Sequence, residues 1–280
     1  MLSRDDEFSR LQARRSLAVR RVALMALLVA LAVVVNVKAA TVPLQVELAG
    51  LRGELRANVE GHLRIFAASN GAGDARTPAL TEKAVRRLHA AATDEIKAAL
   101  KPFGYYSPNI TAELERDEGA WRARYGVEPG PATQLREVIV GIQGEGQNQP
   151  ALTRLIDEAA LAAGEQLSHP EYEELKDALR TDAYALGYLD SRFQRSEIRV
   201  FPDKRVADLA LVLDTGPRFY FGDIVVEQGN LSQTFIDKFV PIKAGDPFEL
   251  RRLTNLQLAL TDSPYFSQAE VTIQRDQSAG

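Results

Sequence analysis

The sequence offers few groupings of side chains that could carry out chemistry. Its three histidines, His62, His89 and His169, are far apart and show none of the short spacings that place two imidazoles on one metal ion. The chain has no cysteine, so thiolate metal sites and thiol redox chemistry are excluded. No serine lies in the Gly-x-Ser-x-Gly pattern of a nucleophile elbow. We therefore expect no metal and no cofactor.

Two denser clusters could also carry chemistry. Glu113, Glu115, Asp117 and Glu118 could supply the paired carboxylates of a hydrolase, although an acidic hairpin of this kind is more typical of a solvated face. The glycines of residues 141–146 read G-x-x-G-x-G, which is not the order of a dinucleotide-binding turn. A periplasmic hydrolase that uses Glu115 and Asp117 stays an alternative, whereas the glycines indicate a plain loop.

Composition and charge narrow the class of protein. The 280 residues are 45% hydrophobic and 26% charged, as in ordinary globular proteins, and the length allows one to three domains. The formal net charge is −4, yet residues 1–39 hold seven Lys or Arg and only three Asp or Glu. The rest of the chain is therefore distinctly acidic and lacks the clustered cations that bind nucleic acid or anionic lipid.

The basic N-terminal segment leads into an apolar stretch. Residues 22–35 contain no charge, no Gly and no Pro, and as a helix they would span roughly 21 Å, less than the ~30 Å of a hydrocarbon core. Small residues follow, with a cleavage site after Ala39. The pattern predicts an export signal over residues 1–39. A signal anchor that stays in the membrane is the alternative, and either one takes the rest of the chain out of the cytoplasm.

A short aromatic turn recurs along the rest of the chain. Tyr105, Tyr188 and Tyr265 each lie in such a turn and are 83 and 77 residues apart. A Gly-Pro pair at residues 130–131 recurs at residues 216–217, which is 86 residues later, and each pair precedes a β-branched apolar run. Two markers with nearly one period indicate an internal repeat.

Each repeat unit is predicted to be β-α-α-β-β. In the middle unit, Ser168 is placed to cap the second helix with Glu171 three residues later, and Gly187 supplies the left-handed residue that ends this helix. A short β-branched run predicts the first strand, and apolar residues three and four apart predict the second helix. The predicted elements of the middle unit are a strand at 138–140, helices at 151–163 and 168–186, and strands at 192–200 and 206–213.

The other two units follow the same order. The first has a strand at 44–51, a helix with one apolar face over 55–66, a second helix capped by Thr81, and a hairpin over 110–127. The third has a short helix at 236–240, a second helix capped by Asp246, and a strand at 269–273, but no final strand. We therefore predict an α+β fold of tandem units at 40–129, 130–215 and 216–280, the third lacking its last strand.

This order of elements behind an export signal resembles the POTRA (polypeptide-transport-associated) domain family, and within it the TamA type of outer-membrane assembly protein. The turn after the second helix carries much of the resemblance. Its residues in the three units, which we expect to be structural, are Gly104, Tyr105, Tyr106, Gly187, Tyr188, Leu189, Tyr265 and Phe266.

The resemblance implies a periplasmic protein associated with the outer membrane that takes part in protein or autotransporter assembly and is not an enzyme. It also implies protein partners: an outer-membrane β-barrel of its own or of a separate chain, an inner-membrane-anchored partner similar to TamB, and unfolded outer-membrane clients. No small-molecule substrate is implied. An inner-membrane-anchored POTRA scaffold similar to the division protein FtsQ is the alternative.

The predicted fold also suggests where binding takes place. A three-stranded sheet under two helices leaves an exposed edge, to which an extended segment can add a strand through main-chain hydrogen bonds. The candidate edge strands run from Asn109 to Glu115 and from Arg192 to Val200. The opposing interpretation is that both are merely solvated edges, with arginines that discourage pairing.

Overall fold

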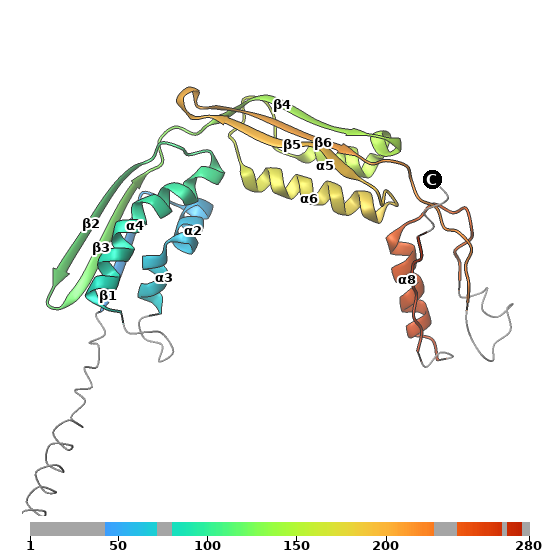
Figure 1. Cartoon of the computed structure of the whole chain (residues 1–280), viewed down its shortest axis with the longest axis horizontal. Coiled ribbons are helices and arrows are strands. Elements are labelled where there is room, and N and C mark those ends of the chain that lie inside the picture. Colours follow the sequence, from blue (N-terminus) through green and yellow to red (C-terminus); the bar gives the residue numbers. More distant parts are fainter. Residues whose placement is uncertain (1–42, 72–79, 227–239, 265–267, 276–280) are drawn as a thin grey trace, which may run out of the picture.

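A computed structural model describes residues 43–71, 80–226, 240–264 and 268–275. The predicted export signal, residues 236–239 of the predicted helix at 236–240, and Tyr265 and Phe266 lie outside these ranges. In the described parts, no helix is both long enough and apolar enough to cross a bilayer. Two sheet-and-helix units and a further helix follow one another in an arched row, with the helices on the inner side and the sheets on the outer side (Figure 1).

Both sheet-containing units have the predicted β-α-α-β-β order, so the α+β tandem fold is confirmed. Unit 1 consists of β1 (Leu44–Ala49), α2 (Gly53–His62), α3 (Arg64–Asn70), α4 (Glu82–Leu100), the 3-10 turn η1 (Lys101–Phe103), β2 (Asn109–Asp117) and β3 (Ala120–Glu128). Unit 2 consists of β4 (Gln134–Gln143), η2 (Glu145–Asn148), α5 (Pro150–Glu158), α6 (His169–Ala185), β5 (Arg192–Phe201), η3 (Pro202–Lys204) and β6 (Val206–Asp214).

In each unit the last strand lies in the middle of the sheet. The order is β1-β3-β2 in unit 1 and β4-β6-β5 in unit 2. The central strand pairs in parallel with the first strand and antiparallel with its hairpin partner. The helices follow the first strand in the chain and cover one face of the sheet. The hairpin then places the last strand parallel to the first strand. The other face is left to solvent.

Each unit has its own hydrophobic core. In β3 every second side chain is buried, and Trp121, Ala123, Tyr125 and Val127 pack under the helices of unit 1. In unit 2, Leu209, Leu211 and Leu213 of β6 are buried in the core beneath α5 and α6 (Figure 1), and Ala210 and Val212 between them are buried as well. The side chains of a strand point to the two faces of its sheet, whereas its main-chain N–H and C=O groups lie in the plane of the sheet. Packing of the core therefore leaves the main-chain groups of the outer strands free for other contacts.

Local signals read from the sequence set the helix ends. The side chains of Thr81 and Ser168 accept hydrogen bonds from the main chain three residues later, at 3.3 Å in both cases. Gly104 and Gly187 adopt φ angles of 81° and 96°, so both lie in the left-handed region that a side chain would strain. The second helix of each unit therefore turns abruptly towards the hairpin.

The first helix of unit 1 differs from the prediction, because it is two helices rather than one. Leu63 adopts an extended conformation between α2 and α3, with φ −84° and ψ 100°. The carboxylate of Glu95, on α4, accepts a hydrogen bond from the backbone N–H of Arg64 at 2.9 Å and so satisfies the new helix start. A partner 31 residues away stabilises this break. The predicted helix at 151–163 is likewise shorter, since α5 ends at Glu158.

The third unit departs further from the prediction. Its helix α8 (Leu250–Thr261) begins four residues after Asp246, which instead accepts hydrogen bonds from the backbone of Lys243 and the guanidinium of Arg252. Residues 221–226 and 268–275 contain no strand. The two complete sheets give the reason. In each of them the two outer strands are joined only through the central strand, β3 or β6. No counterpart of this central strand lies among the described residues of unit 3.

Candidate functional site

Strand β2 exposes one row of main-chain groups to solvent. Among the described residues it pairs only with β3. Trp121 of β3 donates its backbone N–H to Pro43 at 2.8 Å, on the side of β1, so Arg116 opposite it directs its own N–H and C=O away from β3. The alternation of the strand then leaves the main-chain groups of Ile110, Ala112 and Leu114 on the open edge as well.

Strand β5 has a similar but less regular edge. Thr215, just past β6, donates its backbone N–H to Gln143, the last residue of β4, so residues two, four and six positions earlier face β4 as well. Their partners on β5, which include Ser196 and Ile198, therefore face the open edge. The register shifts between Phe193 and Arg195, whereas β2 keeps an unbroken register over nine residues. Because a bulge interrupts pairing, β2 is the better template for an added strand.

The solvent face beside the β2 edge is acidic. Glu113 and Glu115 are 64% and 57% exposed, and both lie near Arg124 of the central strand, at 4.0 and 2.9 Å. The same guanidinium also reaches Glu47 of β1 at 3.4 Å. Arg124 therefore lies near three carboxylates, Arg122 of the same strand is the cross-strand partner of Glu115, and Asp117 lies farther along the acidic row. The predicted candidate Asn109 begins this strand and donates to Glu128 at 3.2 Å.

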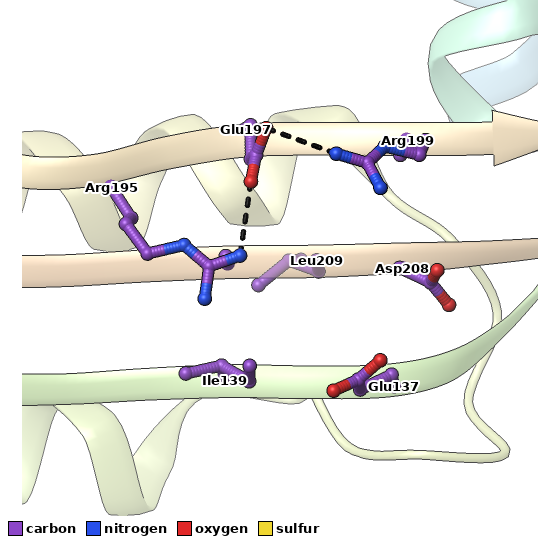
Figure 2. A pocket seen from close by; sticks show the side chains of 8 residues that line it. Glu137, Ile139, Arg195, Glu197, Arg199, Asp208 and Leu209 are labelled. Carbon is purple, nitrogen blue, oxygen red and sulfur yellow. Dashed lines mark hydrogen bonds and ion pairs between the residues drawn. The ribbon is translucent and has the colours of Figure 1, made fainter.

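The solvent face beside the β5 edge carries more cations. Glu197 lies between Arg195 at 3.0 Å and Arg199 at 3.7 Å, as Figure 2 shows. The hydrogen bond from Arg195 holds the pKa of Glu197 below its ordinary value. These side chains border a shallow depression of about 60 Å³. That volume is enough for a few water molecules and too small for a typical ligand pocket.

The arrangement of titratable groups gives no support to a metal site or an acid–base pair. In the ranges that the structure covers, no three His, Cys, Asp or Glu side chains converge as metal ligands would. His89 places Nδ1 2.8 Å from the hydroxyl of Tyr125, and burial lowers the pKa of this imidazole. The carboxylate of Glu115 is 57% exposed and pairs with Arg124 at 2.9 Å.

The Gly-aromatic turns of units 1 and 2 lie where each unit meets the next one, at contacts named here joint 1–2 and joint 2–3. At joint 1–2, Thr133 donates its backbone N–H to the carbonyl of Gly104 at 2.9 Å, and Leu167 donates to Thr133 at 2.8 Å. At joint 2–3, Phe219 donates to Gly187 at 2.8 Å, and Phe248 donates to Phe219 at 3.0 Å. The same pair of main-chain hydrogen bonds therefore links unit 1 to unit 2 and unit 2 to unit 3.

Side chains reinforce both joints. Tyr105 packs against the core of unit 1, whereas its neighbour Tyr106 packs against the core of unit 2. The hydroxyl of Tyr106 lies 3.4 Å from Nε2 of His169, at the start of α6. At joint 2–3, Arg218 donates to the carbonyl of Leu186 at 3.0 Å and lies over the ring of Tyr188. The turns thus position the sheets relative to one another.

Joint 1–2 leads to an expected pH dependence. Burial lowers the pKa of His169 from its ordinary value of 6.5, and the carboxylate of Glu173 opposes this only in part. Above pH 6.5 both the folded and the unfolded forms hold a neutral imidazole. As the pH falls below 6.5 the unfolded form binds the proton first, so the folded form loses stability until the folded pKa is passed.

We expect His169→Gln to flatten this dependence. The measurement is the free energy of unfolding of unit 2 in urea between pH 8 and pH 5, followed by hydrogen exchange in α6. His89→Gln is the matched control, because that histidine has a lowered pKa in unit 1. A pH slope of unit 2 that is the same with and without His169 would contradict the expectation.

The structure describes six of the eight predicted turn residues. The glycines end their helices, Tyr188 is buried in the unit 2 core, and Leu189 is half-buried beside it. The sequence did not reveal which residues of the following unit contact each turn. These residues are Thr133 and Leu167 at joint 1–2, and Phe219 and Phe248 at joint 2–3. A signal was present, since Thr133 and Phe219 each follow a Gly-Pro pair at the same distance and are 86 residues apart.

Comparison with known proteins gives one family match and several similar solved structures. Residues 45–129 match the family model of POTRA domain TamA domain 1, which coincides with unit 1. A crystal structure of Haemophilus influenzae BamA POTRA domains 3–5 overlaps 86% of this chain and 92% of its own, at 13% identity and a TM-score of 0.42. The Omp85 N-terminal domain of the cyanobacterium Thermosynechococcus elongatus overlaps 80% and 88%, at 16% identity and a TM-score of 0.30.

Omp85 POTRA domains 1–3 of Anabaena overlap 78% of this chain and 82% of their own, at 18% identity and a TM-score of 0.28. The family match covers unit 1, and unit 2 repeats the β-α-α-β-β order of unit 1. Unit 1 is therefore similar to a POTRA domain of the TamA type, and unit 2 has the same order of elements.

Proposed function

We propose that this chain is the periplasmic module of a factor that assembles and translocates outer-membrane proteins or autotransporters, and that it acts by binding rather than by catalysis. The predicted signal over residues 1–39 would export it. A TamA-type POTRA domain at 45–129 supports a role in outer-membrane protein assembly. The open edge of β2, with its outward main-chain groups, is the observation that carries the proposed mode of action.

Binding by strand addition fits the partners that such a factor would meet. Unfolded β-barrel segments are extended and alternate in polarity, and an open strand edge offers them main-chain hydrogen bonds with little demand on sequence. The same mode would serve for docking to an outer-membrane β-barrel or to an inner-membrane-anchored partner similar to TamB. The β2 and β5 edges lie in successive units, so a long client could contact both.

The test is to remove one outward-facing donor from the β2 edge. Proline has no N–H, and at Ala112 it would leave the hydrogen bonds between β2 and β3 unbroken, because the N–H of Ala112 faces outward. Ala112 is exposed, so its side chain supports no core. We expect Ala112→Pro to fold and to lose at least tenfold in crosslinking to an unfolded β-barrel client, because it loses a hydrogen bond and disrupts the docked strand.

The matched control is Ala112→Val, which changes the side chain and keeps the main-chain donor. It should crosslink as the unaltered chain does. Ser196→Pro applies the same change to the β5 edge, with Ser196→Ala as its control because the Ser196 hydroxyl contacts Tyr172 at 2.9 Å. If folded Ala112→Pro and Ser196→Pro both retain full crosslinking, strand addition at these edges is wrong.

A further inference from the structure

The two open edges differ in the charge of their solvent-facing side chains. On β2 these side chains include Glu113, Glu115 and Asp117 and no cation. On β5 two arginines, Arg195 and Arg199, flank the single carboxylate of Glu197 (Figure 2). A strand added to either edge lies about 4.8 Å away, so its own solvent-facing side chains contact this row directly.

The charges of the unit 1 sheet alternate from strand to strand. Glu47 of β1, Arg124 of β3 and Glu113 of β2 are cross-strand partners in one continuous register. The outer strands therefore carry acid and the middle strand carries base. A new strand next to β2 continues this alternation only if it carries cations, whereas an acidic strand would place like charges opposite each other.

The two arginines of the middle strand, Arg122 and Arg124, face three carboxylates of β2 and do not cancel this acidic row. The nearest carboxylate to Arg124 is Glu115 at 2.9 Å, while Glu113 is 4.0 Å away and Glu47 competes from the other side at 3.4 Å. Glu113 is 64% exposed and lies on the edge strand itself. Its carboxylate is therefore accessible to a Lys or Arg on an incoming strand.

We propose that the β2 edge selects extended polypeptide segments that carry Lys or Arg at alternate positions. This inference rests on the proposed function, since it names the class of segment that the edge binds. Main-chain hydrogen bonds supply the binding, and the acidic row adds a preference among segments. Each cross-strand charge pair contributes a modest amount, and like charges directly opposite weaken binding by a similar amount.

The experiment compares three nine-residue peptides on the full-length chain. All share the same alternating Val and Thr frame, and their remaining alternate positions are all Lys, all Ser or all Glu. Because the chain has no cysteine, Asn109→Cys gives a single fluorophore site at the start of β2. At ~20 mM salt we expect the Lys peptide to bind about tenfold more tightly than the Glu peptide, with the Ser peptide between them.

Two variants locate the effect. Glu113→Lys with Glu115→Lys should reverse the order of the Lys and Glu peptides. Glu47→Lys is the matched control, because it makes the same change on the same face at the opposite edge, two strands away, and should leave the order unchanged. At ~1 M salt, where charges are screened within about 3 Å, the three affinities should converge.

The outcomes separate the two proposals. Equal binding of all three peptides at low salt, abolished by Ala112→Pro, would overturn the charge selection and leave strand addition intact. Failure of every peptide to bind, with no signal change at any salt concentration, would overturn strand addition at β2 itself. An unchanged order in the Glu113→Lys and Glu115→Lys double variant would show that the preference arises elsewhere and would also overturn the inference.

Discussion

Replacing Gly187 by alanine should open joint 2–3. The residue has φ 96°, and a methyl group there would lie 2.6 Å from the carbonyl oxygen of Phe248 and 3.3 Å from that of Phe219. Left-handed strain of about 1–2 kcal/mol adds to the cost of displacing main chain that cannot move freely. We expect a total cost of about 3 kcal/mol, much of it relieved by separation of units 2 and 3.

The matched control is Gly245→Ala in unit 3. Gly245 also has a left-handed φ, of 84°, but no atom lies within 4 Å of the position of an added methyl group. This variant therefore carries strain without the clash. Spin labels on Glu174→Cys of α6 and Asn255→Cys of α8 report the distance between the units. The distribution should broaden for Gly187→Ala and stay narrow for Gly245→Ala, and equal widths in the two variants would contradict the role assigned to this joint.

Truncating the core of one unit should unfold that unit alone. Ile96 of α4 is fully buried in the core of unit 1, and Ile96→Ala should lower the free energy of unfolding of this unit by about 2–5 kcal/mol. The cores of the two units share no residue, so the amides of β6 should keep their protection from hydrogen exchange.

Leu179→Ala in α6 is the reciprocal variant, because Leu179 is fully buried in unit 2. It should expose the amides of β6 to exchange and leave those of β3 protected. Parallel loss of protection in both units, from either variant, would mean that they unfold as one body and that the repeat is not a series of independent cores.

The parts of the fold that the sequence predicts are those set by residues close together in the chain. Thr81 and Ser168 are capping residues whose hydrogen bonds lie within one turn, and Gly104 and Gly187 are needed for a left-handed backbone. Apolar alternation predicted the hairpin of unit 1, since every second side chain of β3 is buried. Such signals depend only on neighbours in the chain, so they can be recognised without tertiary structure.

Features set by distant partners were missed. The helix break at Leu63 is stabilised by Glu95, which no local pattern connects to it. The central position of the last strand depends on how the hairpin returns beside the first strand, and residues 221–226 form no strand in a unit whose described residues include no such central strand. The candidate edges at 109–115 and 192–200 were predicted, but the choice of outward donors required the register of β3 and β6.

Residue-resolved hydrogen exchange of β2, with and without an unfolded outer-membrane β-barrel segment, is the most direct test of strand addition. The register predicts that the segment protects every second amide, namely those of Ile110, Ala112, Leu114 and Arg116. The intervening amides already bond to β3 and should change little. Bound segment with no new protection on β2 or β5, or protection confined to the helices, would contradict the mechanism.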